Sequence, residues 1–421
     1  MRQTWRWFGP ADTISIPEIR QTGAEGIVSA LHHIAPGDVW TSNEITKRKC
    51  EIEQAKAVGP KVRSMQAHEV VPQARSGEKK EPSGLTWDVV ESVPVSETIK
   101  TKTGPVTDHY EAYRQSLRNL ADQGLKTVCY NFMPILDWTR TDLAAQMPDG
   151  ATAMRFDLLE FCIFDALLLA RPGAEDDYPD AMLADARARH AGMSDAEKQK
   201  LVNNIVAGLP GANDSWTLDN VRAQLATYAA IDAGQLRQNL IDFLSEIVPT
   251  AEEVGIRLCC HPDDPPFSLL GLPRVMSTTD DYAAVLDAVD SPASGATLCT
   301  GSLGVRADFD PANFVQKLGP KIHFVHLRNT QRTEPAAGQK SSFYESEHLG
   351  GDTDMVATIG ALLAEQKRRK AEGRADWQIP MRPDHGQAML DDLTRNSMPG
   401  YPLIGRMRGL AELRGIMQAL G

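Results

Sequence analysis

The sequence lacks the long apolar runs of a membrane protein. No stretch of its 421 residues approaches 18 consecutive apolar residues, and the opening MRQTWRWFGP has no apolar signal-peptide core. Cysteine is scarce, and the six that occur lie mostly in apolar, strand-like or helical runs. In a chain with no export signal, such cysteines are typical of reduced thiols. We therefore expect a cytoplasmic protein with neither a disulfide framework nor a membrane partner.

The chain is also poor in positive charge. Lys and Arg total 44 against 56 Asp and Glu, which gives a formal net charge of -12. This balance repels polyanions and argues against nucleic acid as a partner. The phosphate-binding patterns GxxxxGK[ST] and GxGxxG are missing too. A small anionic substrate stays compatible with the composition, because a local cluster of Arg, Lys or metal inverts the local potential.

Eight short runs of β-type composition end in polar residues or in Pro and Gly. They are residues 4–9, 26–34, 86–94, 126–134, 256–264, 296–303, 321–329 and 377–385. Amphipathic helical patterns separate most of them, such as residues 109–124 and 354–373. Eight strands alternating with helices predict a parallel (β/α)₈ barrel of the TIM type, here one domain over residues 1–421.

Two stretches exceed what a minimal barrel needs. The fourth and fifth predicted strands lie far apart, and the helical patterns between them, with Ser194 as an N-cap, predict a helical insertion over residues 135–240. Residues 59–84 are rich in Gly, Pro, Lys and Ser and lack periodicity. They predict an exposed, mobile loop.

Potential metal ligands stand at the ends of the last four predicted strands. They are His261, Cys299, His326 and Asp384. The carboxyl ends of the strands of a (β/α)₈ barrel converge on one mouth. Cys299 alone is typical of a small core residue and His326 alone of a hydrogen-bonded histidine, but four such residues at equivalent positions favour a metal site. A thiolate with two imidazoles favours Fe²⁺, Mn²⁺, Co²⁺ or Zn²⁺ over Mg²⁺.

Further polar side chains follow the predicted strands. Arg306 and Arg328 are candidates to clamp a substrate carboxylate, and His32 and Asn131 are candidates for other substrate contacts. A surface charge or a loop hydrogen bond is the alternative for each of them. The sequence alone leaves this choice open.

The segment MRPDHG, residues 381–386, places a carboxylate and an imidazole side by side. A polar surface turn is one explanation. Adjacent strand residues point in opposite directions unless the turn bends, so His385 does not readily share an ion with Asp384 and is free for proton transfer. Tyr401 lies in a Pro/Gly-rich loop after the last strand, from which it can swing over the mouth.

A family resemblance covers nearly the whole chain. It rests on the ordered, collinear runs TWRWFGP, ALHHI, VESVP, CYNFMPILDWTRTDL, HPDDPP, LGLPR, CTGSLGVRAD, HLRN, MRPDHG and PGYPLIGR. These runs resemble mannonate dehydratases of hexuronate degradation, which are metal-dependent barrels of the xylose-isomerase-like group. Residues 59–84 depart from the pattern, because close members of the family are shorter there.

The resemblance implies a hydro-lyase that removes water from D-mannonate to give 2-dehydro-3-deoxy-D-gluconate. It implies Mn²⁺ or Fe²⁺ held by the residues matching His261, Cys299, His326 and Asp384. It also implies acid–base roles for His385 and Tyr401, without deciding which is the base, and a homo-oligomer, dimeric or larger.

The implied chemistry explains why these residue types occur together. Removing the C2 proton of a sugar acid builds charge on its carboxylate, which a chelated metal stabilises. A base takes the proton, and an acid protonates the departing C3 hydroxyl.

Three alternative functions fit these residues less well. A sugar isomerase of the same barrel group uses two carboxylate-bridged metals, which a single Cys-containing site fits poorly. A non-catalytic sugar-acid-binding protein needs no acid–base pair beside a metal. An endonuclease-like phosphodiesterase would need a basic face, which the net charge of -12 disfavours.

Overall fold

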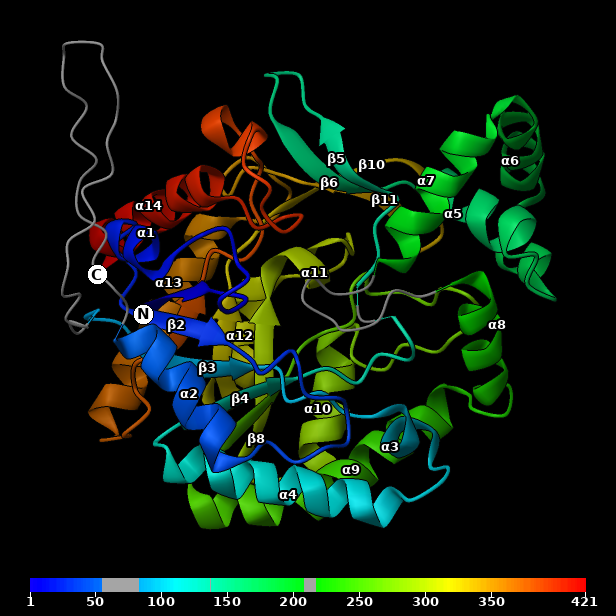
Figure 1. Cartoon of the computed structure of the whole chain (residues 1–421). Coiled ribbons are helices and arrows are strands. Elements are labelled where there is room, and N and C mark those ends of the chain that lie inside the picture. The colour runs from blue at the N-terminus through cyan, green and yellow to red at the C-terminus, as the bar shows by residue number, and fades with distance from the viewer. Residues whose placement is uncertain (55–82, 137, 208–216) are drawn as a thin grey trace, which may run out of the picture.

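The computed structural model describes residues 1–54, 83–136, 138–207 and 217–421. A closed barrel of parallel strands lies at its centre, in the order β1-β12-β9-β8-β7-β4-β3-β2 (Figure 1). The strands are β1 (Arg2–Arg6), β2 (Gly26–Ser29), β3 (Thr86–Glu91), β4 (Thr127–Tyr130), β7 (Arg257–Cys260), β8 (Ser294–Cys299), β9 (Ile322–His326) and β12 (Pro380–Arg382). Each overlaps one predicted run, so the predicted (β/α)₈ barrel is confirmed.

Helices surround the barrel (Figure 1). They are α1 (Ile16–Gln21), α2 (Ser42–Glu53), α3 (Glu97–Thr101), α4 (Val106–Asp122), α9 (Ala233–Val254), α10 (Thr279–Ala288), α11 (Thr300–Gly304), α12 (Pro311–Leu318), α13 (Met355–Ala371) and α14 (Leu403–Leu420). Helix α4 shows why they pack inward: Tyr110, Tyr113, Leu117 and Leu120 are buried at helical spacing. The barrel closes where the two ends of the chain meet, since Arg2 pairs with Pro380.

A second, antiparallel sheet lies outside the barrel, with strand order β10-β11-β6-β5. Strands β5 (Asp142–Gln146) and β6 (Thr152–Phe156) follow β4, whereas β10 (Thr330–Ala337) and β11 (Lys340–Glu345) follow β9. Two loops far apart in the sequence therefore build one sheet. Figure 1 shows it on the side of the barrel toward which β8 points.

Residues 135–240 contain both helices and a hairpin. The helices are α5 (Leu158–Cys162), α6 (Asp180–Gly192), α7 (Asp195–Val206) and α8 (Leu218–Thr227), with a π-helix at Ile163–Leu168 and a 3₁₀ helix at Ala174–Asp177. Ser194 caps α7 as predicted. The helical interpretation missed the β5–β6 hairpin, which turns at Pro148-Asp149-Gly150, where Gly150 has a φ of 87°. Such a Pro-Asp-Gly turn needs the left-handed backbone that glycine adopts freely.

Two further expectations concern the surroundings of the barrel. The loop expected over residues 59–84 lies outside the described residues, apart from Ser83 and Gly84. In the part of the chain that the structure describes, no helix has the length and apolar character needed to cross a bilayer.

The barrel interior changes character along its strands. An apolar cluster, here termed the packing layer, consists of Val28, Val89, Cys129, Cys259 and Phe324. Side chains two residues apart on a strand share a face, so the next inward positions toward the carboxyl ends form a second layer. This polar layer consists of Glu91, Asn131, His261 and His326, whereas the fifth position, directly after β2, is the apolar Ala30. One step along each strand therefore separates packing from chemistry.

Candidate metal centre and active site

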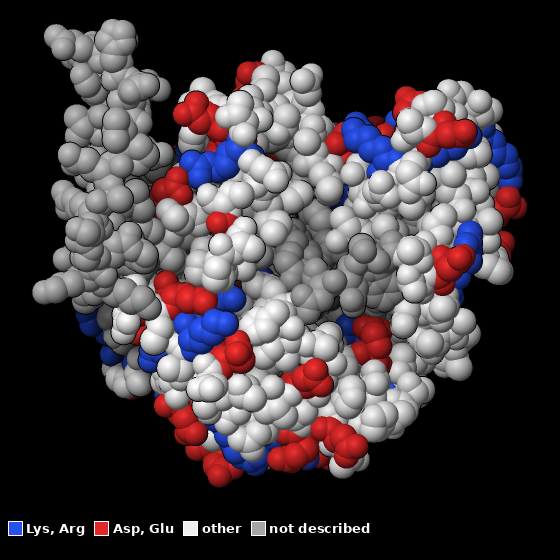
Figure 2. All heavy atoms as spheres, in the orientation of Figure 1, with Lys and Arg blue, Asp and Glu red and all other residues white. Residues whose placement is uncertain are grey.

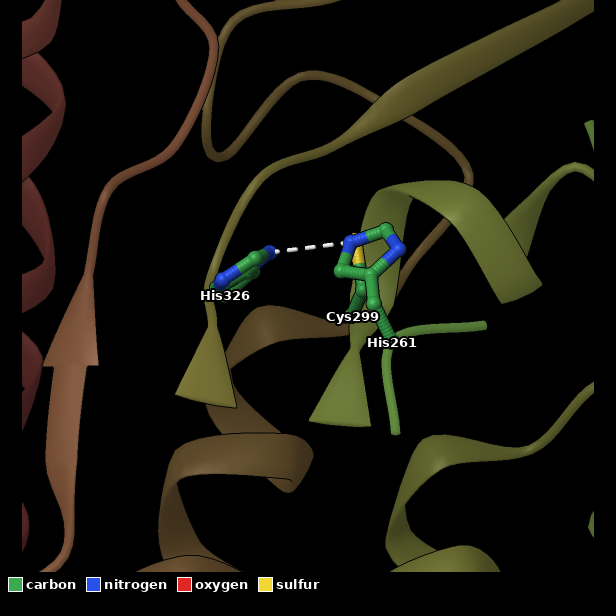
Figure 3. A group of neighbouring side chains, drawn as sticks. All are labelled: His261, Cys299 and His326. Atoms are coloured by element: carbon green, nitrogen blue, oxygen red, sulfur yellow. Dashed lines mark hydrogen bonds between the residues drawn. The ribbon is translucent and has the colours of Figure 1, made fainter. Parts of the chain in front are cut away.

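The structure brings the four predicted metal ligands together. Ligand atoms of His261, Cys299 and His326 all lie within 4.8 Å of one another. Figure 3 shows the two imidazoles facing each other beside the Cys299 sulfur, with His261 Nε2 3.2 Å from His326 Nδ1. Asp384 Oδ2 lies 3.6 Å from His326 Nδ1 and 3.9 Å from Cys299 Sγ.

Strand ends position these ligands. His326 and Cys299 are the last residues of β9 and β8, and His261 directly follows β7. Cys299 also caps α11, because its Sγ accepts a hydrogen bond from Ser302 N at 3.4 Å. Asp384 follows β12 with a φ of 55°, in the left-handed region. This bend lets Asp384 and its neighbour His385 line the same cavity.

The nitrogen and carboxylate donors suit a cation. His261 Nδ1 lies 2.7 Å from Pro262 O, so it donates there and leaves the Nε2 lone pair facing the cluster. Burial and then His326 lower the pKa of His261 to about 4, so the ring is neutral. Burial would raise the pKa of Asp384, but Arg382 and His385 hold it well below its usual range. The set thus supplies two neutral imidazoles and an anionic oxygen.

The thiol completes this donor set. Burial raises the pKa of Cys299 to about 12, although Arg328 opposes the shift. A divalent cation displaces such a proton when it binds a thiol. The four residues therefore fit a divalent transition metal.

His261 and Asp384 line a cavity of about 460 Å³, counting its opening to solvent. Of the predicted substrate contacts, Asn131 and Arg328 line this cavity. So do residues that the sequence analysis did not single out, namely Arg6, Phe8, Glu91, Ser92, Met133, Trp138, Asp264 and Arg382.

His32 and Arg306 are not among the cavity-lining residues, unlike the prediction. His32 Nε2 accepts a hydrogen bond from Arg6 Nη2 at 3.2 Å, so it lies behind a residue of the wall. Arg306 follows α11, which carries it past the mouth. Its guanidinium donates to Asp308 at 3.0 and 2.7 Å.

Charged side chains surround the cavity in balanced numbers. Four arginines (Arg6, Arg140, Arg328 and Arg382) form ion pairs with four carboxylates (Glu91, Asp264, Glu345 and Asp384). Arg140 connects the barrel to the outer sheet. Its Nη1 lies 2.9 Å from Oδ1 of Asp264, which follows barrel strand β7, and its Nη2 lies 2.7 Å from Oε1 of Glu345, which ends β11 of the outer sheet. Buried charges are tolerated only when they are paired in this way.

On the outer surface, charge has a different arrangement. On the face shown in Figure 2, basic and acidic side chains are interspersed. The arginines of the cavity are hidden, since Arg140 is 0% and Arg328 1% exposed. The guanidinium groups around the cavity are therefore internal, each paired with a carboxylate.

Arg328 is occupied by protein groups. Nη2 lies 2.5 Å from Asp264 Oδ2, and Nη1 lies 3.3 Å from Asp384 Oδ2 and 2.9 Å from His385 Nδ1. Its side chain passes over Gly301, where a Cβ would lie 2.2 Å from Arg328 Cγ. This geometry suits a residue that orients its neighbours better than a free clamp for a carboxylate.

Both predicted acid–base residues border the cavity beside Asp384. His385 Nδ1 lies 3.1 Å from Glu345 Oε1. The rings of His385 and Tyr401 pack edge to face, with their centroids 4.9 Å apart. Tyr401 Oη lies 3.5 Å from Asp384 Oδ1. Burial raises the pKa of Tyr401 to about 12 against the opposing effect of Arg382, so its hydroxyl is protonated.

Comparisons with known proteins agree along the whole chain. A family model described as D-mannonate dehydratase (UxuA) matches residues 1–76 and 70–421. Mannonate dehydratase 1 of Agrobacterium fabrum is 54% identical, with 100% of this chain and 97% of that protein covered. The mannonate dehydratase of Rhizobium meliloti is 52% identical with the same coverage. The crystal structure of mannonate dehydratase from Streptococcus suis serotype 2 aligns with a TM-score of 0.71 at 29% identity, covering 100% of this chain and 93% of that one.

Proposed function

Because this chain belongs to the D-mannonate dehydratase family, we propose how its own residues divide the work of that reaction. The protein is a hydro-lyase that removes water from D-mannonate to give 2-dehydro-3-deoxy-D-gluconate, and its family is metal-dependent. One observation carries the assignment of roles: four possible metal donors converge beside a cavity that two acid–base side chains, His385 and Tyr401, line.

His261, Cys299, His326 and Asp384 hold Mn²⁺ or Fe²⁺ in this proposal. Their mutual distances, the free lone pair of His261 and the anionic Asp384 support it. When bound, the cation supplies Lewis acidity that stabilises negative charge on the substrate carboxylate.

His385 takes the C2 proton. His385 Nδ1 lies 3.1 Å from Glu345 Oε1 and 2.9 Å from Arg328 Nη1. When the ring hydrogen is on Nδ1, Glu345 accepts it and Nε2 is left for the substrate. Tyr401, protonated, gives its hydroxyl proton to the departing C3 hydroxyl, so the C3–O bond breaks and water leaves. The enol then tautomerises to the 2-keto acid. Arg328 holds His385 and Asp384 in place, and Asn131 contacts the substrate from the wall.

Metal exchange tests this proposal. Purified protein is treated with a chelator, reloaded with single metals and assayed for 2-keto-3-deoxy acid formed from D-mannonate. Activity should be lost on chelation and return with Mn²⁺ or Fe²⁺ to a greater extent than with Mg²⁺, because a thiolate is a poor ligand for Mg²⁺. Equal rescue by Mg²⁺ would contradict the inclusion of Cys299 in the ligand set.

We also propose a cytoplasmic location and a homo-oligomer. All six cysteines are free thiols, which supports a reducing compartment. Leu390, Leu393 and Met407 are exposed apolar side chains near the C-terminal end of the chain, and such side chains support a subunit contact. Light scattering on purified protein would report a monomer if the oligomer is wrong.

A further inference from the structure

The two ring nitrogens of His326 have different surroundings. Nδ1 faces the metal ligands, 3.2 Å from His261 Nε2 and 3.6 Å from Asp384 Oδ2. Nε2 faces away from them, 3.1 Å from Arg382 Nε and 3.5 Å from Glu91 Oε2. Nδ1 is therefore the nitrogen available to a cation, and Nε2 is oriented by Arg382 and Glu91.

The hydrogen bonds in the structure run in one direction. His261 Nδ1–H donates to Pro262 O, so His261 Nε2 accepts from the Nδ1–H of His326. His326 Nε2 in turn accepts from Arg382 Nε–H. This pattern places the ring hydrogen of His326 on Nδ1, the nitrogen that a cation would need bare.

Glu91 is an acceptor with one oxygen left over. Its Oε1 receives a hydrogen bond from Arg382 Nη2 at 2.8 Å. No described residue donates a hydrogen bond to Oε2, although Arg6 Nη1 lies at an ion-pair distance of 3.2 Å. Its ion pairs with Arg382 and Arg6 are those of an ionised carboxylate. A buried anionic oxygen without a donor is costly, which indicates that a donor reaches it in another state of the site.

We propose that Glu91 is a positioning residue that accepts the Nε2–H of His326 whenever His326 Nδ1 binds the metal; this rests on the metal site proposed above. A ligating nitrogen uses its lone pair, so the ring hydrogen must lie on the other nitrogen. Arg382 Nε–H is a donor and cannot accept that hydrogen. Glu91 Oε2 accepts it after a small approach from 3.5 Å, so the partner of Nε2 changes from Arg382 to Glu91.

Metal affinity provides the first test. Metal-stripped wild type, Glu91→Ala and Glu91→Gln are titrated with Co²⁺, and the thiolate-to-cobalt absorption is followed. Glu91→Ala should bind Co²⁺ about 10- to 100-fold more weakly, as is usual when the outer partner of a ligand is removed. Glu91→Gln keeps an amide oxygen that accepts Nε2–H and should recover most of the affinity.

Controls separate this inference from the metal site itself. Glu365 is also a buried carboxylate paired with an arginine, but it lies on α13, 2.8 Å from Arg369. Glu365→Ala should bind Co²⁺ like the wild type. Wild-type affinity in Glu91→Ala would overturn the role of Glu91 alone. Wild-type affinity in His326→Ala would overturn the proposed site and this inference with it.

Proton NMR provides a test that needs no alanine variant to fold. The Co²⁺-loaded wild type in H₂O should show two shifted imidazole N–H signals that disappear in D₂O, from His261 Nδ1–H and His326 Nε2–H. Glu91→Gln should displace the His326 signal and leave that of His261 unchanged. Two signals at identical positions in both proteins would overturn the role of Glu91.

Discussion

The packing layer and the polar layer of the barrel lie two residues apart on the same strands, yet they obey different rules. Val89, Cys259 and Phe324 are fully buried among apolar neighbours. Glu91, His261 and His326, one step farther along those strands, line or adjoin the cavity, and Glu91 and His326 have charged partners. The backbone is the same in both, so the difference lies in the arginines and carboxylates that converge from the strand ends and from the loops that follow them. A barrel supports chemistry at the end where loops supply compensating charge.

Substitution of two cysteines, one in the packing layer and one at the proposed metal site, should give the largest difference in activity. Cys299→Ala removes a proposed ligand and should reduce metal content and activity together to background. Cys259→Ala, in the packing layer, should retain both and cost only about 1–2 kcal/mol of stability, because a small apolar side chain is lost. Metal analysis, kinetics and urea unfolding on both variants measure the contrast. Loss of metal from Cys259→Ala would show that the layers are not separate.

Substitutions of the neighbouring residues Asp384 and His385 should lower activity for different reasons. His385→Asn leaves the four proposed ligands in place and should lower kcat by roughly 10²–10⁴ with metal content and KM nearly unchanged. Asp384→Asn removes an anionic ligand and should lower metal content and activity in parallel. Metal analysis beside steady-state kinetics distinguishes the two outcomes. A folded His385→Asn protein without metal would reverse the assignment.

A smaller effect should come from the outer sheet. Glu345 ends β11, and its Oε1 lies 3.1 Å from His385 Nδ1, where it accepts Nδ1–H in the proposed base. Glu345→Gln should therefore lower kcat by about 10- to 100-fold, as for other outer partners of an active-site histidine. Tyr344→Phe, at the neighbouring position, is the matched control and should leave kcat unchanged. Equal kcat values for the two variants would mean that the sheet only covers the site.

The smallest effect on activity should come from a histidine in neither layer. His323 on β9 is 3% exposed, and burial, Arg257 and Arg369 lower its pKa from 6.5 to about 3. The folded state then binds fewer protons than the unfolded state, so stability falls as the pH falls from 6.5 toward 3. Leucine does not titrate, so His323→Leu should lose about 1.4 kcal/mol less unfolding free energy per pH unit than the wild type. Its kcat should be unchanged. Urea unfolding at two pH values in this window checks it; parallel losses in both proteins would refute it.

The strand-end rule explains how much of the site could be predicted from the sequence. Barrel strands end in polar residues that meet at one mouth, which was enough to place His261, Cys299 and His326 together. The same rule applied to β1 and β3 identifies Arg6 and Glu91, which the analysis of the last four strands did not reach. It fails for Glu345, because the pairing of β11 with β6 joins segments far apart in sequence and leaves no local signal. It also fails for Arg306, because a short helix follows the strand.

The outer sheet has a consequence for how such a protein can be altered by evolution or engineering. Its two hairpins come from different loops but share one ladder, in which Phe343 pairs with Phe156 and Tyr344 with Arg155. Substitutions in one hairpin therefore change the docking surface of the other, and their effects should be non-additive. A homologue's hairpin transplanted alone would meet a mismatched edge. We therefore expect the two hairpins to change together. A chimaera that exchanges both hairpins should keep the structure of the sheet at the barrel mouth.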